Sequence, residues 1–400
     1  MQIGRATFRR LPARNDEMMD AQPYAVAAAT VFDGSMAHSN SAVLIEEGCI
    51  QWLGRRADVP RHVPIHDLPS GCWLAPGFID LQVNGGGDVL FNEDPTPAGI
   101  AQIVAAHRRF GTTALLPTLI SNTHEKMVTA LQVVQQLPAN FGVLGIHFEG
   151  PFLSREKCGV HDPAQLRRPT DADLRLLVSP RPGATLVTLA PEEVPEGFIA
   201  ELVRAGVRVS LGHSMATYVE TKKALAEGLT GCTHLFNAMR PLASREPGPI
   251  AAVLETANAW FGMIADGVHV DPAMLRLALR GTARPMLVTD AMPPVGGRRQ
   301  SFLLDGDPVE VRDATCLRWD GRLAGSALDM ASAVRNCVRL LDVPLTAALR
   351  YASREPATFL GLGDRFGALA SGYQADMVAF APENVRVIAT WVAGKCVVAG

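Results

Sequence analysis

The sequence lacks the features that would place it in a membrane or on a nucleic acid. None of its apolar runs approaches the roughly 18 residues that a helix needs to cross a bilayer. Lysine and arginine together number 37 against 40 aspartates and glutamates, for a net charge of −3. A nucleic-acid-binding domain would show a basic face or stripe, and there is no long basic run. We therefore expect no membrane and no nucleic-acid partner.

Paired cysteine motifs are also absent. The seven cysteines are dispersed and form no CxxC pair, which argues against a disulfide framework and is typical of a reducing, cytoplasmic environment. The first apolar stretch, Ala25–Phe32, is short and meets the turn signal Asp33-Gly34, so we interpret it as a strand rather than as a signal peptide. Residues 1–20 are predicted to be a disordered extension, and the protein is predicted to be cytoplasmic.

The composition is that of a globular protein with room for two units. With 400 residues, 48% of them hydrophobic and 19% charged, the chain can hold a (β/α)8 barrel of roughly 250 residues and a smaller module. From residue 21, short strand patterns separated by turn signals predict a hairpin-rich β module. These strands are Ala25–Val31, Ala42–Ile45 and Ile50–Leu53.

From residue 76, apolar strands alternate with helical patterns. Eight such strands predict a parallel sheet buried on both faces, and their number favours a closed TIM-like barrel over an open doubly wound sheet. No GxGxxG motif follows the first strand, which weakens a dinucleotide-binding alternative. The predicted strands are Phe78–Val83, Thr112–Pro117, Val143–Phe148, Thr185–Leu189, Arg208–Leu211, Gly231–His234, Phe261–Ala265 and Met286–Thr289. The helices between them include Ala98–Phe110, Met127–Leu137, Ile199–Ala205, Thr217–Glu227 and Pro272–Arg280.

Strand patterns return after residue 290 and continue to the C-terminus. The predicted elements are strands at Ser301–Leu304, Pro308–Val311, Met377–Phe380 and Val387–Val398, with helices at Asp329–Leu341 and Leu345–Leu360. The simplest interpretation joins the N- and C-terminal strands in one small β-sandwich. Residues 21–75 and about 375–400 then form the sandwich, and residues 76–374 form the catalytic barrel.

Polar side chains interrupt the apolar pattern where the barrel strands end. The C-terminal ends of barrel strands meet at one rim, which is where the active sites of such barrels lie. The strand ends deliver Gln82 and Asn84 (first strand), Glu149 (third), His213 (fifth), His234 (sixth), Asp266 to His269 (seventh) and Asp290 (eighth).

One glutamate and two histidines at that rim predict a metal site. Three protein ligands leave a position open for water, whose pKa a bound metal lowers from about 15.7 to about 7. Asp290 is placed to take the proton of that water and pass it to a leaving amine. Taken singly, Glu149 could be a turn residue, and His213 and His234 could be hydrogen-bonded core histidines. Their coincidence at equivalent strand ends favours amide hydrolysis.

Around these residues the chain resembles the N-acetylglucosamine-6-phosphate deacetylases of the amidohydrolase superfamily. The resemblance covers roughly residues 25–400, and its HLFNAM and EGPF motifs are specific to that family rather than to barrels in general. The matching stretches are PGFIDLQVNG (76–85), GIHFEGPFL (145–153), GHS (212–214), THLFNAM (233–239) and VTDAM (288–292).

The resemblance implies a (β/α)8 barrel with a small β-sandwich, usually in a homodimer. It implies hydrolysis of N-acetylglucosamine 6-phosphate to glucosamine 6-phosphate and acetate. The arginine of the phosphate site is commonly donated by the neighbouring subunit, and its planar fork can bind phosphate oxygens bidentately. The matching residues are Glu149, His213 and His234 (metal), Asp290 (catalytic acid and base), His161 (substrate carbonyl), His269 (sugar), and Asn237, the Ala238 backbone and Arg245 (phosphate).

The chain departs from many superfamily members at the end of the first strand. A His-x-His pair that holds a second metal is replaced by Gln82 and Asn84, which we interpret as vestigial second-metal positions. Neutral amides bind a divalent cation far less well than imidazoles do. One metal ion per subunit is therefore expected; Zn²⁺ suits the ligand set best, and Fe²⁺, Co²⁺ or Mn²⁺ would also be accepted.

Other interpretations stay open at this point. The epimeric substrate N-acetylgalactosamine 6-phosphate differs at one hydroxyl. The sequence does not show which of the two epimers is preferred. Another amidohydrolase, such as a cyclic-amide hydrolase, would usually show the histidine pair on the first strand and a bridging lysine. A non-catalytic amidohydrolase-like scaffold would typically have lost a ligand or the final aspartate, whereas here the set is complete.

Overall fold

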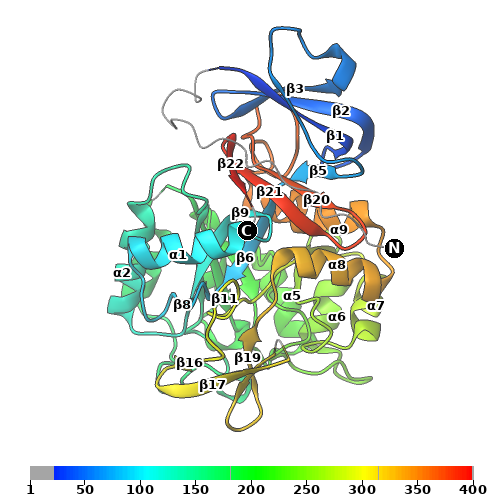
Figure 1. Ribbon diagram of the computed structural model, residues 1–400. Helices are drawn as coiled ribbons and strands as arrows, with labels where there is room; N and C mark the ends of the chain where they lie inside the picture. The colour runs from blue at the N-terminus through cyan, green and yellow to red at the C-terminus, as the bar shows by residue number, and fades with distance from the viewer. Residues whose placement is uncertain (1–21, 181, 314, 399–400) are drawn as a thin grey trace.

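The computed structural model describes residues 22–180, 182–313 and 315–398. It contains a large barrel and a smaller sheet, which lie one above the other in Figure 1. The predicted α/β fold class is confirmed. The predicted disordered extension, residues 1–20, lies outside the described residues.

Eight parallel strands form the nearly closed barrel that the sequence predicts. Each strand is hydrogen-bonded to the next in the order given below. The first and last strands meet through an isolated bridge between Val83 and Ala291. Every residue of β6 and β9 is buried, which explains the nearly continuous apolar runs. The strands are β6 (Phe78–Val83), β9 (Thr112–Ile120), β10 (Gly145–Glu149), β11 (Ala184–Leu189), β12 (Arg208–Leu211), β13 (Gly231–Cys232), β14 (Trp260–Met263) and β15 (Arg284–Leu287).

Helices surround this barrel, and several begin at a threonine cap. The hydroxyls of Thr96, Thr123, Thr170 and Thr217 each accept a hydrogen bond from a backbone N–H in the first turn, which satisfies a donor that the helix leaves free. Two of the helices, α3 and α6, are not among the examples of predicted helices given above. The helices are α1 (Pro97–Arg108), α2 (His124–Gln135), α3 (Asp171–Val178), α4 (Phe198–Arg204), α5 (Tyr218–Glu227), α6 (Gly248–Leu254), α7 (Pro272–Ala278), α8 (Met330–Leu341), α9 (Leu345–Ala352) and α10 (Arg354–Leu360).

The prediction of one helix over Leu345–Leu360 is wrong. The chain forms α9 and α10 with a break at Ser353. Pro356 has no N–H and its ring would clash with the carbonyl four residues earlier in a continuous helix. Starting a new helix at Arg354 places this proline in a first turn, where it is tolerated.

The small β unit joins the two ends of the chain in one sheet, as predicted. The central contact pairs β5 with β20 antiparallel, with Leu74 opposite Ala379. Apolar clusters lie against this sheet around Val43 and Met377 and around Ala42 and Val63. The sheet order is β22-β21-β20-β5-β1-β2-β3, with β4 beside β1. The bounds are β1 (Tyr24–Phe32), β2 (Ala37–Glu46), β3 (Cys49–Arg55), β4 (Ile65–Asp67), β5 (Trp73–Pro76), β20 (Met377–Ala381), β21 (Arg386–Val392) and β22 (Lys395–Val398).

The predicted single strand Val387–Val398 is instead the hairpin of β21 and β22. Ala393 and Gly394 both have positive φ, 46° and 76°, as a tight two-residue hairpin turn requires. The domain boundaries near residues 75 and 375 stay a prediction.

A third sheet was only partly anticipated. The predicted strands at 301–304 and 308–311 exist, but with two further strands they form a separate antiparallel sheet. Its apolar face packs around Val309 and Cys316 against Ile120 and Met292, which lie near the ends of barrel strands. Its strands are β16 (Ser301–Leu304), β17 (Asp307–Arg312), β18 (Thr315–Arg318) and β19 (Leu323–Ser326), and β7 (Gly85–Gly86) and β8 (Val89–Leu90) form a short hairpin after β6.

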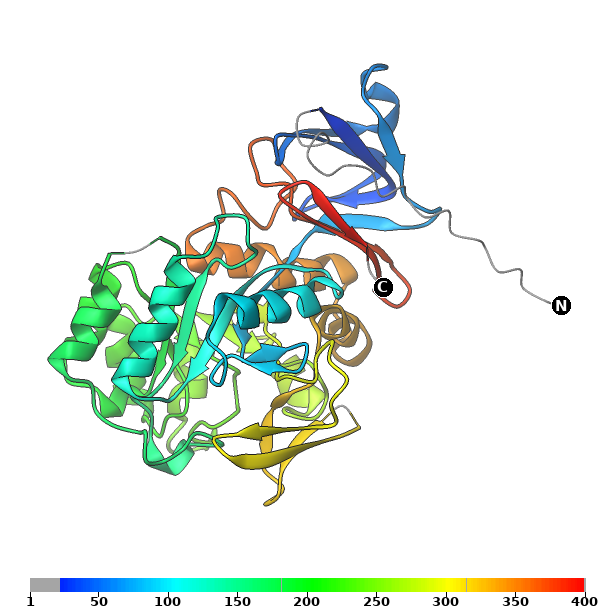
Figure 2. The ribbon, with the colours of Figure 1, turned by 60° about the vertical axis from the view of Figure 1, so that its left-hand side comes forward.

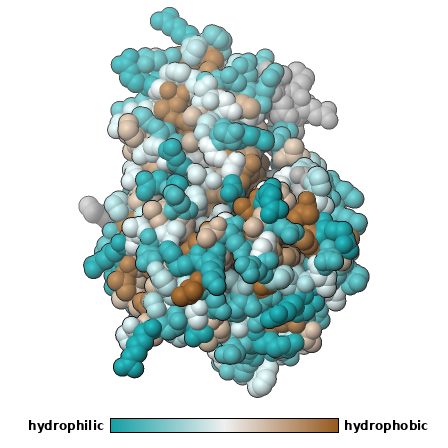
Figure 3. All heavy atoms as spheres, turned by 180° about the vertical axis from the view of Figure 1, so that it is seen from behind, coloured by the Kyte–Doolittle hydropathy of each residue, from teal (hydrophilic) through white to brown (hydrophobic). Residues whose placement is uncertain are grey.

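The two accessory sheets lie at opposite ends of the barrel. In Figures 1 and 2 the small sheet is above the barrel and the β16–β19 sheet is below it. Strand β6 starts directly after β5 of the small sheet, so its C-terminal end points toward β16–β19. On the face shown in Figure 3, apolar residues form separate patches among hydrophilic ones. Within the described part of the chain, no helix combines the length and apolar character that crossing a membrane requires.

Candidate active site

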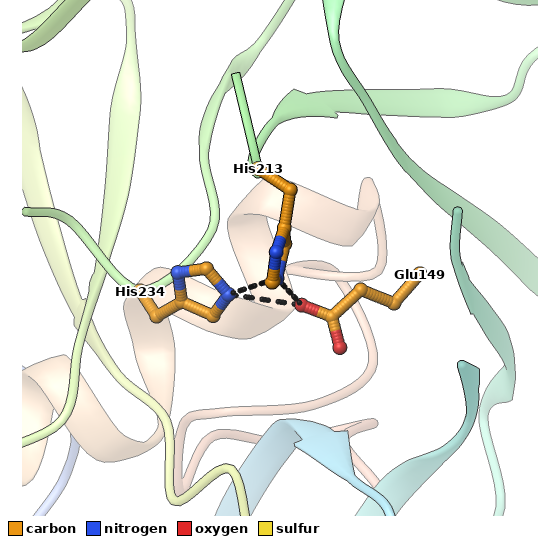
Figure 4. A group of neighbouring side chains, drawn as sticks. All are labelled: Glu149, His213 and His234. Atoms are coloured by element: carbon orange, nitrogen blue, oxygen red, sulfur yellow. Dashed lines mark hydrogen bonds and ion pairs between the residues drawn. The ribbon is translucent and has the colours of Figure 1, made fainter. Parts of the chain in front are cut away.

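Glu149, His213 and His234 meet at the C-terminal rim of the barrel, facing one another as Figure 4 shows. Oε1 of Glu149 lies 2.9 Å from Nε2 of His234 and 3.3 Å from Nε2 of His213, and the two nitrogens are 3.1 Å apart. All three side chains are buried. Burial acts to raise the pKa of Glu149, but the imidazoles of His213 and His234 beside it outweigh burial and hold that pKa well below its usual value.

The backbone turns sharply where these side chains leave their strands. His213, His234 and Asp290 have φ angles of 48°, 30° and 53°, a region that residues other than glycine seldom occupy. Such strained positions cluster at functional sites, where the surrounding structure fixes them. Gly150, directly after Glu149, also has a positive φ, and a Cβ there would lie 2.2 Å from Oγ of Ser121. The loops at this rim therefore depend on particular backbone conformations.

The donor set fits a divalent metal ion. A tetrahedral ion with nitrogen and oxygen ligands at its usual bond lengths spaces those ligands about 3.3 Å apart, close to the separations found here. Two imidazole nitrogens 3.1 Å apart cannot both carry a proton directed at the other, so at least one of them presents a lone pair within the cluster. Nδ1 of His213 lies 2.8 Å from the carbonyl of Lys157; donation there leaves Nε2 free to act as a ligand.

Asp290 lies beside this cluster and is linked to it by Gln82. The Gln82 amide donates to Oε1 of Glu149 over 3.0 Å and to Oδ1 of Asp290 over 3.1 Å. The amide of Asn84 donates to the same Oδ1 over 2.7 Å. Burial, and then repulsion by Glu149, raise the pKa of Asp290 to about 6, a value suited to a group that must both accept and return a proton.

His161 is held beside the cluster in a defined protonation state. Its ring lies 4.5 Å from that of His213, and its Nδ1 accepts from the backbone N–H of Ser121 over 3.3 Å. Burial, and then the proximity of His213, lower the pKa of His161 to about 3, so the ring is neutral. With Nδ1 accepting, the proton is on Nε2, which can donate to a carbonyl oxygen.

The residues predicted to contact the sugar and the phosphate lie in the loops that follow barrel strands β13 and β14. Nδ1 of His269 lies 2.6 Å from a carboxylate oxygen of Asp266, whose other oxygen caps the turn. The side-chain amide of Asn237 donates to the carbonyl of His234 over 3.2 Å, and the carbonyl of Ala238 accepts from Ser214. Arg245 is exposed, and among residues 22–180, 182–313 and 315–398 no hydrogen bond or ion pair to it is found. The structure does not bring Arg245 into contact with the metal cluster.

Two further polar groups were not anticipated. Asp80 is fully buried on β6, where its carboxylate accepts from the hydroxyl of Thr289 over 2.5 Å, and burial raises its pKa to about 7. Ser121 holds His161 through its hydroxyl as well as its backbone. A signal for Asp80 was available, because it alternates with Gln82 and Asn84 along an apolar strand. Ser121 had none, since its contact joins residues 40 positions apart.

Comparisons with known proteins agree with this geometry. The model of the amidohydrolase family matches residues 73–397. The chain is 44% identical to N-acetylgalactosamine-6-phosphate deacetylase of Shewanella sp. (strain ANA-3), over 83% of this chain and 84% of that protein. It is 34% identical to N-acetylglucosamine-6-phosphate deacetylase of Haemophilus influenzae, over 88% of this chain and 94% of that protein. The crystal structure of N-acetylglucosamine-6-phosphate deacetylase from Pasteurella multocida superposes with a TM-score of 0.90 at 35% identity, covering 94% of this chain and 100% of that one.

The chain therefore belongs to the amidohydrolase family, the class that its barrel and its metal-type cluster define. Within that family, each of these three relatives is named as a deacetylase of an N-acetylated amino-sugar phosphate.

Proposed function

We propose that this protein hydrolyses the acetamido bond of N-acetylglucosamine 6-phosphate, giving glucosamine 6-phosphate and acetate. The observation that carries the proposal is the cluster of Glu149, His213 and His234 at the barrel rim, with the carboxylate of Asp290 beside it. These are the parts that amide hydrolysis requires: a metal site, a proton acceptor and a neutral hydrogen-bond donor. The N-acetylglucosamine-6-phosphate deacetylase at 34% identity supports this substrate, and the relative at 44% identity supports deacetylation of an amino-sugar phosphate in general.

We propose that the cluster holds one divalent ion per subunit. Zn²⁺ suits one carboxylate and two imidazoles best, and Fe²⁺, Co²⁺ or Mn²⁺ are alternatives. When bound, such an ion lowers the pKa of a water ligand and polarises the acetamido carbonyl.

The protein's own groups would move the proton and stabilise the developing charge. Asp290 accepts a proton from the attacking water and later donates it to the departing amine. Nε2–H of His161 donates to the carbonyl oxygen as negative charge develops there. The buried position of both groups strengthens these interactions, because little solvent competes.

Sugar and phosphate contacts are assigned to residues around this centre. His269, oriented by Asp266, is placed to contact the sugar. Arg245, Asn237 and the Ala238 backbone are assigned to the phosphate. The exposed guanidinium of Arg245, without an acidic partner in residues 22–398, is free to bind an anion bidentately.

We also propose a cytoplasmic homodimer in which Arg245 completes the site of the neighbouring subunit. Val219 and Leu242 are exposed large apolar side chains, and Leu242 lies in the same loop as Arg245, which suits a contact surface. All seven cysteines are free, as expected in a reducing compartment.

N-Acetylgalactosamine 6-phosphate is the second candidate substrate. The specific observation in its favour is the 44% identity to the Shewanella enzyme, above the 34% to the Haemophilus enzyme. The two substrates differ in the orientation of one hydroxyl, so Asp290 and the metal cluster would have the same roles with either of them.

Acetate release from both epimeric sugar phosphates and from unphosphorylated N-acetylglucosamine tests the function. We expect the highest kcat/KM for N-acetylglucosamine 6-phosphate and little activity on the unphosphorylated sugar. A higher kcat/KM for N-acetylgalactosamine 6-phosphate would make that epimer the assigned substrate. Absence of acetate release from all three, by a sample with metal bound, would favour a non-catalytic scaffold.

A further inference from the structure

Strand β6 places three polar side chains on one face of the barrel wall. Asp80, Gln82 and Asn84 alternate along the chain and are 0%, 1% and 3% exposed. Buried polar groups are costly unless they are hydrogen-bonded. As vestigial metal positions, Gln82 and Asn84 would have no defined partner, and Asp80 would have no role at all. The contacts of these three residues show a different pattern.

The two amides converge on a single oxygen. Both Gln82 and Asn84 donate to Oδ1 of Asp290, over 3.1 and 2.7 Å. Two donors on Oδ1 fix the plane of the carboxylate. Within the described chain no hydrogen-bond partner is found for Oδ2, so this is the oxygen left to accept a proton.

Asp80 acts on the backbone that carries Asp290. One oxygen of Asp80 accepts from the hydroxyl of Thr289 over 2.5 Å, and the other accepts from the backbone N–H groups of Thr289 and Gln82 over 3.3 and 3.2 Å. Thr289 directly precedes Asp290, whose φ is 53°. This contact also spans the seam of the barrel, where β6 and β15 share no ladder of hydrogen bonds. Asp80 thus fixes the backbone position and Gln82 and Asn84 fix the carboxylate.

We infer that the row Asp80, Gln82 and Asn84 is a positioning device for Asp290. It holds Oδ1 and directs Oδ2 at the attacking water. The inference rests on the proposed deacetylation, because it assigns these residues to that reaction. It replaces the interpretation of Gln82 and Asn84 as vestiges of a second metal site.

The first test compares two buried asparagines. Asn84→Ala removes the donor to Asp290, whereas Asn92→Ala removes an equally buried amide that bonds only to the backbone of Ile120. Loss of a hydrogen bond to a charged group predicts a fall in kcat of about 10- to 100-fold for Asn84→Ala. The KM, the metal content per chain and the affinity for glucosamine 6-phosphate should stay within about twofold of wild type. Asn92→Ala should retain the wild-type kcat.

A second, conservative pair covers the case in which Asn84→Ala does not fold. Thr289→Val keeps the volume of the side chain but removes the hydroxyl that donates a hydrogen bond to Asp80. Thr289→Ser keeps that hydroxyl. We expect kcat to fall in the valine variant and to recover in the serine variant. Crystals of metal-free Asn84→Ala, or of metal-free Thr289→Val, should show the Asp290 carboxylate rotated or in two orientations.

The outcomes separate this inference from the proposed function. If wild type releases no acetate, the function fails and the inference fails with it. If wild type is active but Asn84→Ala and Thr289→Val match its kcat, the positioning role alone is overturned. Loss of bound metal in both variants would also overturn it, because the residues would then act through the metal site.

Discussion

At the scale of single residues, the site sets each protonation state by burial and by one or two neighbours. Burial and Glu149 raise the pKa of Asp290, while burial and His213 lower that of His161. The result is a carboxyl group that can exchange a proton near neutral pH beside an imidazole that stays neutral and donates. Amide hydrolysis needs both, since the base removes a proton before the leaving amine receives one.

Replacement of Asp290 by asparagine tests the proton-transfer role. The amide cannot accept a proton, so we expect turnover to fall by about 10²–10⁴-fold. Metal content, measured by plasma mass spectrometry, should stay at the wild-type ratio because Glu149, His213 and His234 are unchanged. An Asp290→Asn protein that purifies without metal would instead place Asp290 among the ligands.

Much of this site is predictable from sequence, for a physical reason. A charged or imidazole side chain at the end of an apolar strand is easy to recognise in the sequence. Parallel barrel strands end at one rim, so such residues are expected to lie close together. Glu149, His213, His234 and Asp290 are visible in this way. Ser121 is not, because its importance lies in a contact with His161, 40 positions along the chain. The alternation of Asp80 with Gln82 and Asn84 marks it as a polar strand residue but does not reveal its contact with Thr289. The hydrogen bonds of Gln82 and Asn84 to Asp290 were not anticipated, because these residues were compared only with metal-binding histidines.

At the scale of elements, the sequence predicts the eight barrel strands because most of them are largely apolar, although β12 and β15 each begin with an arginine and β13 has only two residues. The errors fall where a single residue alters the backbone. Pro356 divides one predicted helix into α9 and α10, and the turn at Ala393 and Gly394 divides one predicted strand into a hairpin. Both signals are present in the sequence. The β18–β19 hairpin is harder to predict, since its strands are short and half exposed.

The small sheet contains a carboxyl group that makes its stability depend on pH. Asp376 accepts hydrogen bonds from Gln374 and from the backbone of Ala393, and so ties the start of β20 to the turn between β21 and β22. Burial raises its pKa to about 6. Because the folded state holds this proton more tightly than the unfolded chain, the contribution of Asp376 is fully favourable below about pH 4 and is lost as pH rises through about 6.

The variant Asp376→Asn should remove that dependence. We compare the free energy of unfolding of the variant with that of wild type at each pH. The variant's value minus the wild-type value should be about 3 kcal/mol larger at pH 7 than at pH 4. Urea unfolding followed by tryptophan fluorescence measures this, since Trp52 and Trp391 lie in the small sheet. An equal difference between the two proteins at both pH values would show that the pKa of Asp376 is not raised in the folded protein.

At the scale of the whole molecule, the barrel rim lies far from the small sheet, next to the β16–β19 sheet (Figures 1 and 2). Strand β19 contacts the site directly, because the backbone N–H of Ser326 donates to the carbonyl of Asp290. Exposed Arg245 lies outside the central cluster. In the proposed homodimer, the arginine of a second subunit would complete the proposed phosphate site without any change in the barrel.

Arg245→Ala should raise the KM for the phosphorylated substrate by about 10- to 100-fold while kcat changes little, because the lost contact binds the phosphate rather than the reacting carbonyl. If the arginine is donated in trans, co-expression with Asp290→Asn should restore activity at low substrate concentration, since a mixed dimer contains one intact site. An unchanged KM removes Arg245 from the phosphate site. If mass spectrometry verifies mixed dimers and activity is still not restored, Arg245 acts within its own subunit.

The position of the metal tests the central claim most directly. Crystals of the purified protein, measured on both sides of the absorption edge of the metal found by elemental analysis, should give one anomalous peak per subunit. We expect that peak between Oε1 of Glu149 and the Nε2 atoms of His213 and His234, and none beside Gln82 and Asn84. A metal-loaded protein with its peak elsewhere, or with a second peak at Gln82 and Asn84, would contradict the one-metal site.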